Sequence, residues 1–160
     1  MLRVVLAAVL ATAVLVASLP AVEDARADRT ATALDTSIAR LSAAGSALAV
    51  GSDATSDPAV APRRAVVLSL PRPTWTAAAV EYVAVGGSPG GPGNRSVVTY
   101  AVEGGGETRR LLSLPVPVRT PGGPVVLRGR GERSVSLSLR ATGEGDAPVL
   151  VVGRGSRSRT

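Results

Sequence analysis

The stretch VVLAAVLATAVLVASLPAV at residues 4–22, followed directly by EDARADRTATALDTSIARLSAAGSALAV at residues 23–50, decides the fold of this chain. The first segment has 19 residues without a charge. As a helix it would be ~28 Å long, which barely spans the ~30 Å hydrocarbon core of a bilayer. Residues 1–22 are therefore predicted to form a transmembrane anchor or a signal segment.

Two fates of this segment remain open. A cleaved signal peptide would be cut near the small residues of Val16–Ser18, and the rest of the chain would be secreted. A retained single-pass anchor would keep the N-terminus in the cytoplasm, because Arg3 precedes the apolar run while Glu23 and Asp24 follow it. We favour the anchor, with the C-terminal domain outside the cell.

Residues 23–50 have the pattern of an amphipathic helix. Apolar or small residues recur there in alternating steps of four and three: Ala27, Ala31, Leu34, Ile38, Leu41, Gly45 and Leu48. This narrow stripe is predicted to pack on the protein's own sheet. The alternative is a coiled-coil-like seam with another subunit, for which Leu34, Ile38 and Leu41 are candidate partner-binding residues. Pro20 is expected to kink the helix rather than to end it.

Beyond a linker at residues 51–64 the apolar period changes to two, which is typical of strands. The candidate strands are residues 65–70, 80–85, 96–102, 109–118, 125–128, 133–140 and 148–152. Pro115 and Pro117 make the fourth strand an edge strand or split it. Gly- and Pro-rich joints between strands favour antiparallel hairpins. The predicted fold is α+β: a long N-terminal helix (transmembrane plus amphipathic), then a small antiparallel β-sandwich or roll at residues 65–152.

Missing residue types exclude several kinds of active site. The chain has no histidine and no cysteine, so Ser-His-Asp and Cys-His nucleophiles, disulfides and Cys/His zinc sites are impossible. An enzyme would have to use carboxylates such as Glu81, Glu103, Glu107 and Glu132, and no spacing singles out a pair. We therefore predict a non-enzymatic protein without a cofactor, a metal site or catalytic residues.

The charge is concentrated in the C-terminal part of the chain. All 18 basic residues are arginines; residues 1–60 carry a net charge of −2 and residues 61–160 a net charge of +8. Such a domain either has a solvated basic surface or binds an acidic partner. Arg128, Arg130 and Arg133, at a predicted hairpin turn, are candidate partner-binding residues, and residues 153–160 form a predicted flexible basic tail. Nucleic acid is a disfavoured partner because no stacking aromatic residue lies near these arginines.

Three further features have a structural and a functional interpretation. Trp75, the only tryptophan, is expected to be the largest side chain of the core, and the alternative is an exposed anchor for a partner or a lipid interface. Glu23, Asp24 and Asp28 are interpreted as carboxylates at the start of the soluble helix, with cation binding as the weaker alternative. Residues 86–93, GGSPGGPG, lack the ending of a phosphate-binding loop and are expected to form a flexible loop that could contact a partner.

The layout and several motifs resemble known families. An apolar helix prolonged as an amphipathic helix on a small sheet resembles type IV pilins and pseudopilins, although Met1–Arg3 lacks their processing site and the apolar run lacks their early glutamate. Residues 1–26, LPRPTWT at 70–76 and YVAVGG at 82–87 resemble an uncharacterised haloarchaeal family of small membrane-anchored proteins associated with type IV pilus and secretion loci. The resemblance implies a pilin-like or accessory component that contacts other subunits or its own copies, and it assigns no catalytic residue. The alternative is a secreted β domain that binds an acidic ligand or surface.

Overall fold

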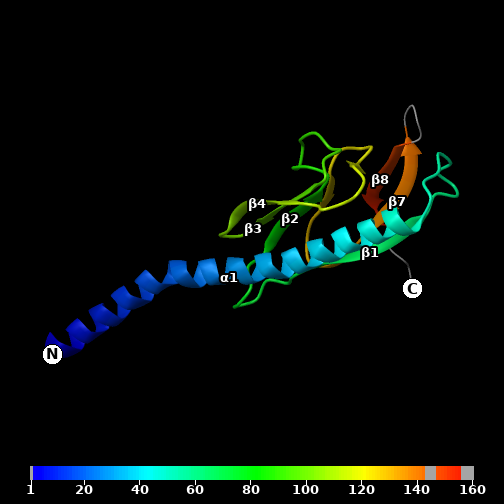
Figure 1. Ribbon diagram of the computed structural model, residues 1–160. Coiled ribbons are helices and arrows are strands. Elements are labelled where there is room, and N and C mark those ends of the chain that lie inside the picture. The colour runs from blue at the N-terminus through cyan, green and yellow to red at the C-terminus, as the bar shows by residue number, and fades with distance from the viewer. Residues whose placement is uncertain (1, 143–146, 156–160) are drawn as a thin grey trace.

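A computed structural model describes residues 2–142 and 147–155 of the chain. Within these residues it contains one long helix, α1 (Leu2–Gly51), followed by eight strands. The strands are β1 (Arg63–Leu70), β2 (Val80–Val85), β3 (Val97–Val102), β4 (Gly106–Leu111), β5 (Val118–Arg119), β6 (Val125–Leu127), β7 (Gly131–Thr142) and β8 (Ala147–Arg154). Figure 1 shows the sheets gathered along the C-terminal half of α1, while the N-terminal half extends away from them. The predicted α+β arrangement is confirmed.

Helix α1 is continuous through Pro20. Proline lacks the N–H that would bond to the carbonyl four residues earlier, and its ring crowds that carbonyl, so a helix bends there. Figure 1 shows a change of direction within the blue N-terminal part of the helix, as expected for a proline kink. Because the helix begins at Leu2, the carboxylates at Glu23, Asp24 and Asp28 do not lie at a helix start. The explanation of these residues by the helix dipole is therefore wrong.

The strands form two four-stranded sheets, with orders β1-β7-β8-β5 and β4-β3-β2-β6. All neighbouring strands are antiparallel except β5 and β8, which form a short parallel pair at Val118–Leu150 and Arg119–Val151. The predicted strand at residues 109–118 is split, since β4 is an edge strand of one sheet and β5 an edge strand of the other. Pro115 and Pro117 lie between them and cannot donate ladder hydrogen bonds.

The observed strands correct the predicted bounds of one turn, the C-terminal tail and the linker. Residues 128–130 were expected to form a hairpin turn, but they cross from β6 in one sheet to β7 in the other. Strand β8 continues to Arg154, so residues 153 and 154 belong to the sheet and not to a tail. Strand β1 already begins at Arg63, inside the predicted linker, and Thr55 of that linker forms a bridge with Arg140 of β7. Residues 156–160 of the predicted tail lie outside the described residues.

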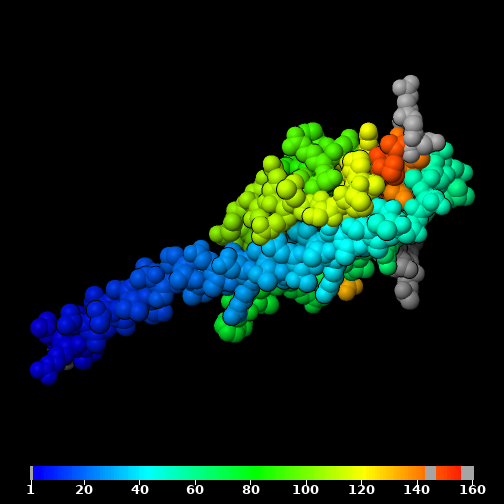
Figure 2. All heavy atoms as spheres, viewed as in Figure 1, coloured from blue at the N-terminus to red at the C-terminus, as the bar shows by residue number. Residues whose placement is uncertain are grey.

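The core consists of valine and leucine side chains between the two sheets and the C-terminal half of α1, with Tyr100 as its largest buried side chain. The predicted helix stripe belongs to this core: all its members are buried except Ala31, which is half-buried against it. Figure 2 shows this half of the helix lying directly against the sheets. The stripe therefore packs on the protein's own sheets, and Leu34, Ile38 and Leu41 are core residues that are covered in this fold.

Candidate functional site

The apolar half of α1 carries most of the exposed large apolar side chains among the described residues. Each of its large apolar side chains, from Leu2 to Val22, is more than half exposed. Soluble domains rarely leave so long an apolar surface in water, because hydrating it costs free energy in proportion to its area. By length and composition this helix could cross a membrane.

The sheet domain begins directly beyond this apolar surface. The β1–β2 loop is bound to α1 by Arg26, whose Nη2 donates to the carbonyl of Thr74 at 3.0 Å and whose carbonyl accepts from the N–H of Ala78 at 3.3 Å. Buried Thr30 donates through Oγ1 to the carbonyl of Ala78 at 3.0 Å. At the tip between β3 and β4, a Cβ added to Gly105 would lie 3.1 Å from that of Ala27, so this turn also touches the helix. Two loops therefore contact α1 within two turns of its apolar run.

Trp75 lies in the β1–β2 loop and is 87% exposed. The expectation that it forms part of the core is therefore wrong. Valine and leucine side chains from β2, β3, β7 and β8 fill the interior together with Tyr100. The alternative interpretation of Trp75, an exposed contact residue for a partner or a lipid interface, agrees with this position.

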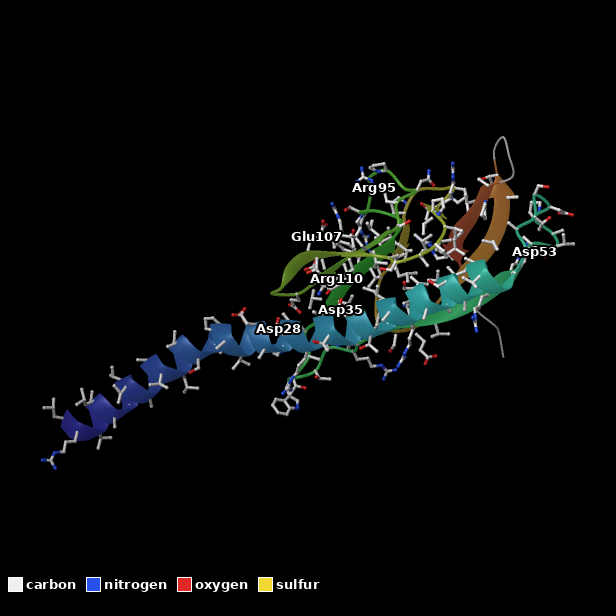
Figure 3. All side chains as sticks on the ribbon, in the orientation of Figure 1. Asp28, Asp35, Asp53, Arg95, Glu107 and Arg110 are labelled. Atoms are coloured by element: carbon white, nitrogen blue, oxygen red, sulfur yellow. The ribbon has the colours of Figure 1, made fainter. Side chains whose placement is uncertain are left out.

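An ion pair fastens the helix to the second sheet. Arg110 of β4 donates through Nε and Nη2 to Oδ1 and Oδ2 of Asp35 at 2.9 and 2.8 Å, and the hydroxyl of Tyr100 donates to Oδ1 at 3.1 Å. Figure 3 shows Asp35 on α1 facing Arg110. The hydrogen bonds from Arg110 hold the pKa of Asp35 below its usual value of 3.8, and burial raises the pKa of Tyr100. The cluster positions the helix against the sheet of β4.

Acid is expected to weaken this connection. The folded pKa of Asp35 lies below 3.8, so its stabilising effect is present above that pH and is lost as the pH falls through the folded pKa. Thermal unfolding of the full chain in detergent should therefore show a drop in Tm below about pH 4 that is smaller in Arg110→Ala. Arg109→Ala is the matched control, because Arg109 contacts Glu107 at 3.9 Å and Ser88 Oγ at 3.2 Å but is not a hydrogen-bond partner of Asp35. Equal acid sensitivity of Arg110→Ala and the wild type would contradict this role of Asp35.

Three arginines line a surface hollow of about 460 Å³ on the sheet domain: Arg128, Arg133 and Arg154. The side chains of two are oriented by backbone carbonyls, since Arg133 Nε donates to Arg128 and Arg154 Nη2 donates to Val126, both at 3.2 Å. Pro89 and Gly90 of the predicted flexible loop complete the rim, and no acidic residue lines it. Arg130, the third arginine predicted for this site, is not part of the lining. The hollow can hold an anionic group.

The Gly-rich loop next to this hollow is anchored at its base. Asn94, with a φ of 63°, donates its N–H to Thr120 Oγ1 at 3.0 Å, and the N–H of Thr120 donates back to Asn94 Oδ1 at 2.8 Å. Thr120 is buried, and a Cβ at Gly93 would collide with its Oγ1. Glycine is therefore required where the loop passes over Thr120.

Carboxylates do not form a recognisable catalytic or metal centre in the part of the chain that the structure describes. No group of three or more potential metal ligands occurs there. Glu23 and Glu103 line one small hollow of about 230 Å³, and Arg26, which lines it too, offsets only part of their charge. Glu107 accepts a hydrogen bond from Tyr82, whose pKa is raised to about 12 by burial and by this carboxylate.

The comparisons with other proteins identify the chain at the level of a family. No curated protein and no solved structure matches it. A family model, described as a domain of unknown function, matches residues 1–155, which include the apolar helix and both sheets. The chain therefore belongs to the DUF7311 family.

Proposed function

We propose that this protein is a non-enzymatic, membrane-anchored envelope protein, a pilin-like or accessory component of a type IV pilus or secretion system. The observation that carries the proposal is that the two halves of one continuous helix have different surroundings. Its first half is apolar and uncovered, and its second half is built into the core of a small β domain. Such a helix can hold the domain at a membrane surface or bundle with other helices in a filament.

Charge and local structure support retention of the helix with the domain outside the cell. Arg3 precedes the apolar run, as expected for a cytoplasmic end. The apolar run is continuous with the half of α1 that is built into the core of the β domain, as expected for an anchor that stays joined to the domain. Both observations favour an anchor over a cleaved signal segment.

The arginine hollow supports a second candidate function. A secreted domain, released by cleavage, would use Arg128, Arg133 and Arg154 to bind an acidic ligand or surface. This function requires a mature N-terminus near Ser18 or Ala21 and binding that weakens as salt screens the arginines. A retained anchor requires neither a new N-terminus nor salt-sensitive binding.

Single cysteines test the proposed assembly, because the natural chain has none. Cysteines are introduced one at a time at residues 4, 5, 6 and 7, which sample all faces of the helix in steps of about 100°. Membranes from cells that express each variant are oxidised, and disulfide-linked dimers are measured on non-reducing gels. A helix bundle is expected to give dimers at one or two positions and few at the opposite face.

The controls separate assembly from anchoring. Val60→Cys, an exposed position in the loop after α1, should give no dimer above that from random collision. Equal, weak cross-linking at all four helix positions would refute a specific bundle while leaving the anchor intact. Recovery of the protein in the medium with a new N-terminus would refute the anchor and favour the secreted binding domain.

A further inference from the structure

We infer that the Trp75 loop, defined as residues 71–79, docks on the lipid headgroup layer of the bilayer that holds α1. In this arrangement the indole of Trp75 inserts beside the helix, and Arg72 faces the lipid phosphates. The inference rests on the anchor that is part of the proposed function. It adds a second point of contact between the domain and the membrane surface.

The Trp75 loop is attached to α1 just beyond the apolar run. The loop is bonded to α1 at Arg26 and Thr30, and the uncharged apolar run ends at Val22. Arg26 is thus four residues beyond the run, or ~6 Å along the axis. The polar layer on each side of the hydrocarbon core is roughly 5–8 Å thick. With the helix close to the membrane normal, the part of the loop that is bonded to Arg26 is therefore held at the level of that layer.

The Trp75 loop belongs to the end of the domain that lies nearest the apolar half of α1 (Figure 2). Figure 2 shows two parts of the domain reaching furthest toward the apolar half of α1: the green loop before β2 and the tip between β3 and β4. These parts are joined, because the N–H of Glu103 donates to the carbonyl of Ala79 at 2.9 Å. The end of the domain that faces the membrane is thus a connected surface rather than a free loop.

The tip of the loop has the chemistry of a membrane-interface residue. Trp75 lies in a tight turn closed by hydrogen bonds between Thr74 and Ala77 in both directions, and it is 87% exposed. Pro71 and Pro73 restrict the backbone before the turn, so little entropy is lost when the tip inserts. Indole rings concentrate at membrane interfaces because the ring is apolar and its N–H stays hydrated.

The charge of the loop itself suits the same occupant, while Glu23 and Glu103 lie beside the base of the loop at Ala78. The loop contains Arg72, which is exposed, and no acidic residue. A basic side chain beside an inserted tryptophan suits the phosphates of an anionic lipid surface. A lipid surface needs no additional partner here, since the anchor itself brings it to the loop.

The test uses Trp75 as its own probe, because it is the only tryptophan. The full chain is reconstituted in vesicles of phosphatidylcholine and phosphatidylglycerol with bromine either near the headgroup or near the end of the acyl chains. We expect the fluorescence of Trp75 to be quenched more strongly by the shallow bromines. We also expect a blue-shifted emission and several-fold less quenching by aqueous acrylamide than for a tryptophan in water.

Two relocated tryptophans serve as references in the Trp75→Phe background. Leu10→Trp reports the middle of the apolar run, and Val60→Trp reports an exposed position on the far side of the domain. If Leu10→Trp is quenched by the deep bromines while Trp75 behaves like Val60→Trp, the lipid contact is refuted and the anchor stands. If Leu10→Trp is not quenched by either lipid, the anchor itself fails. Shielding of Trp75 from acrylamide without bromine quenching would overturn the lipid contact in favour of a protein contact.

Discussion

Replacement of both Leu10 and Val14 by arginine is expected to remove the protein from the membrane fraction that resists alkaline extraction. These residues are one helical turn apart, flank the centre of the apolar run, and are 66% and 60% exposed. An arginine at the centre of a spanning helix costs about 2.5–3.5 kcal/mol on insertion scales, so two cost roughly 5–7 kcal/mol. Neither side chain is near an end of the run, where it could reach the headgroups easily. The measurement is the distribution of protein between pellet and supernatant after carbonate treatment.

The same substitution outside the apolar run provides the control. Val50→Arg and Val60→Arg place the charge at positions that are 80% and 70% exposed near the C-terminal end of α1. Both variants should stay in the membrane fraction like the wild type. If the variant with arginine at residues 10 and 14 also stays there, residues 4–22 are not what holds the protein in the membrane.

Leu34→Ala is expected to destabilise the domain by about 2–5 kcal/mol. Leu34 is 2% exposed within the core between α1 and the sheets, so its truncation removes apolar contacts and leaves a cavity. Chemical unfolding of the full chain in detergent, followed by circular dichroism, gives the change in the free energy of unfolding. Leu111→Ala is the matched control, because Leu111 is 82% exposed and should change stability by no more than about 0.5 kcal/mol.

The dependence on protein concentration shows where Leu34 makes its contacts. Packing within one chain predicts the same unfolding midpoint at all protein concentrations. A seam between subunits predicts a midpoint that rises with concentration, because association stabilises the folded state by mass action. Loss of that concentration dependence in Leu34→Ala would assign the residue to an interface and contradict its place in the core of this fold.

Only part of the arginine hollow could be predicted from the sequence. The sequence indicates Arg128 and Arg133 as candidates, because they are close together in a segment rich in charge and glycine. Arg154 joins them through the pairing of β7 with β8, in which Arg154 lies opposite Val135. That register depends on which faces of two strands are buried, so the proximity of Arg154 is not visible in the spacing along the chain.

The pairing of Asp35 with Arg110 could not be predicted from the sequence either. The two residues are separated by 75 positions, and their contact requires α1 to cross the second sheet beside its edge strand β4. Asp35 follows directly after Leu34 of the apolar stripe, which places it at the border of the buried face. That position alone indicates an acid near the sheet, but it does not identify the residue that binds it.

The sequence by itself determined the helix and its two halves, because both signals are local. Absence of charge over residues 4–22 and a period between three and four over residues 23–50 are properties of neighbouring residues. Only the tertiary structure decided that residues 109–118 divide between two sheets and that Trp75 faces solvent beside the helix. Burial depends on which distant strands pair and on which side chains already fill the space between them. In this chain valine and leucine side chains and Tyr100 fill that space. Trp75, the largest side chain of the protein, remains exposed in the loop that is bonded to α1 just beyond its apolar half.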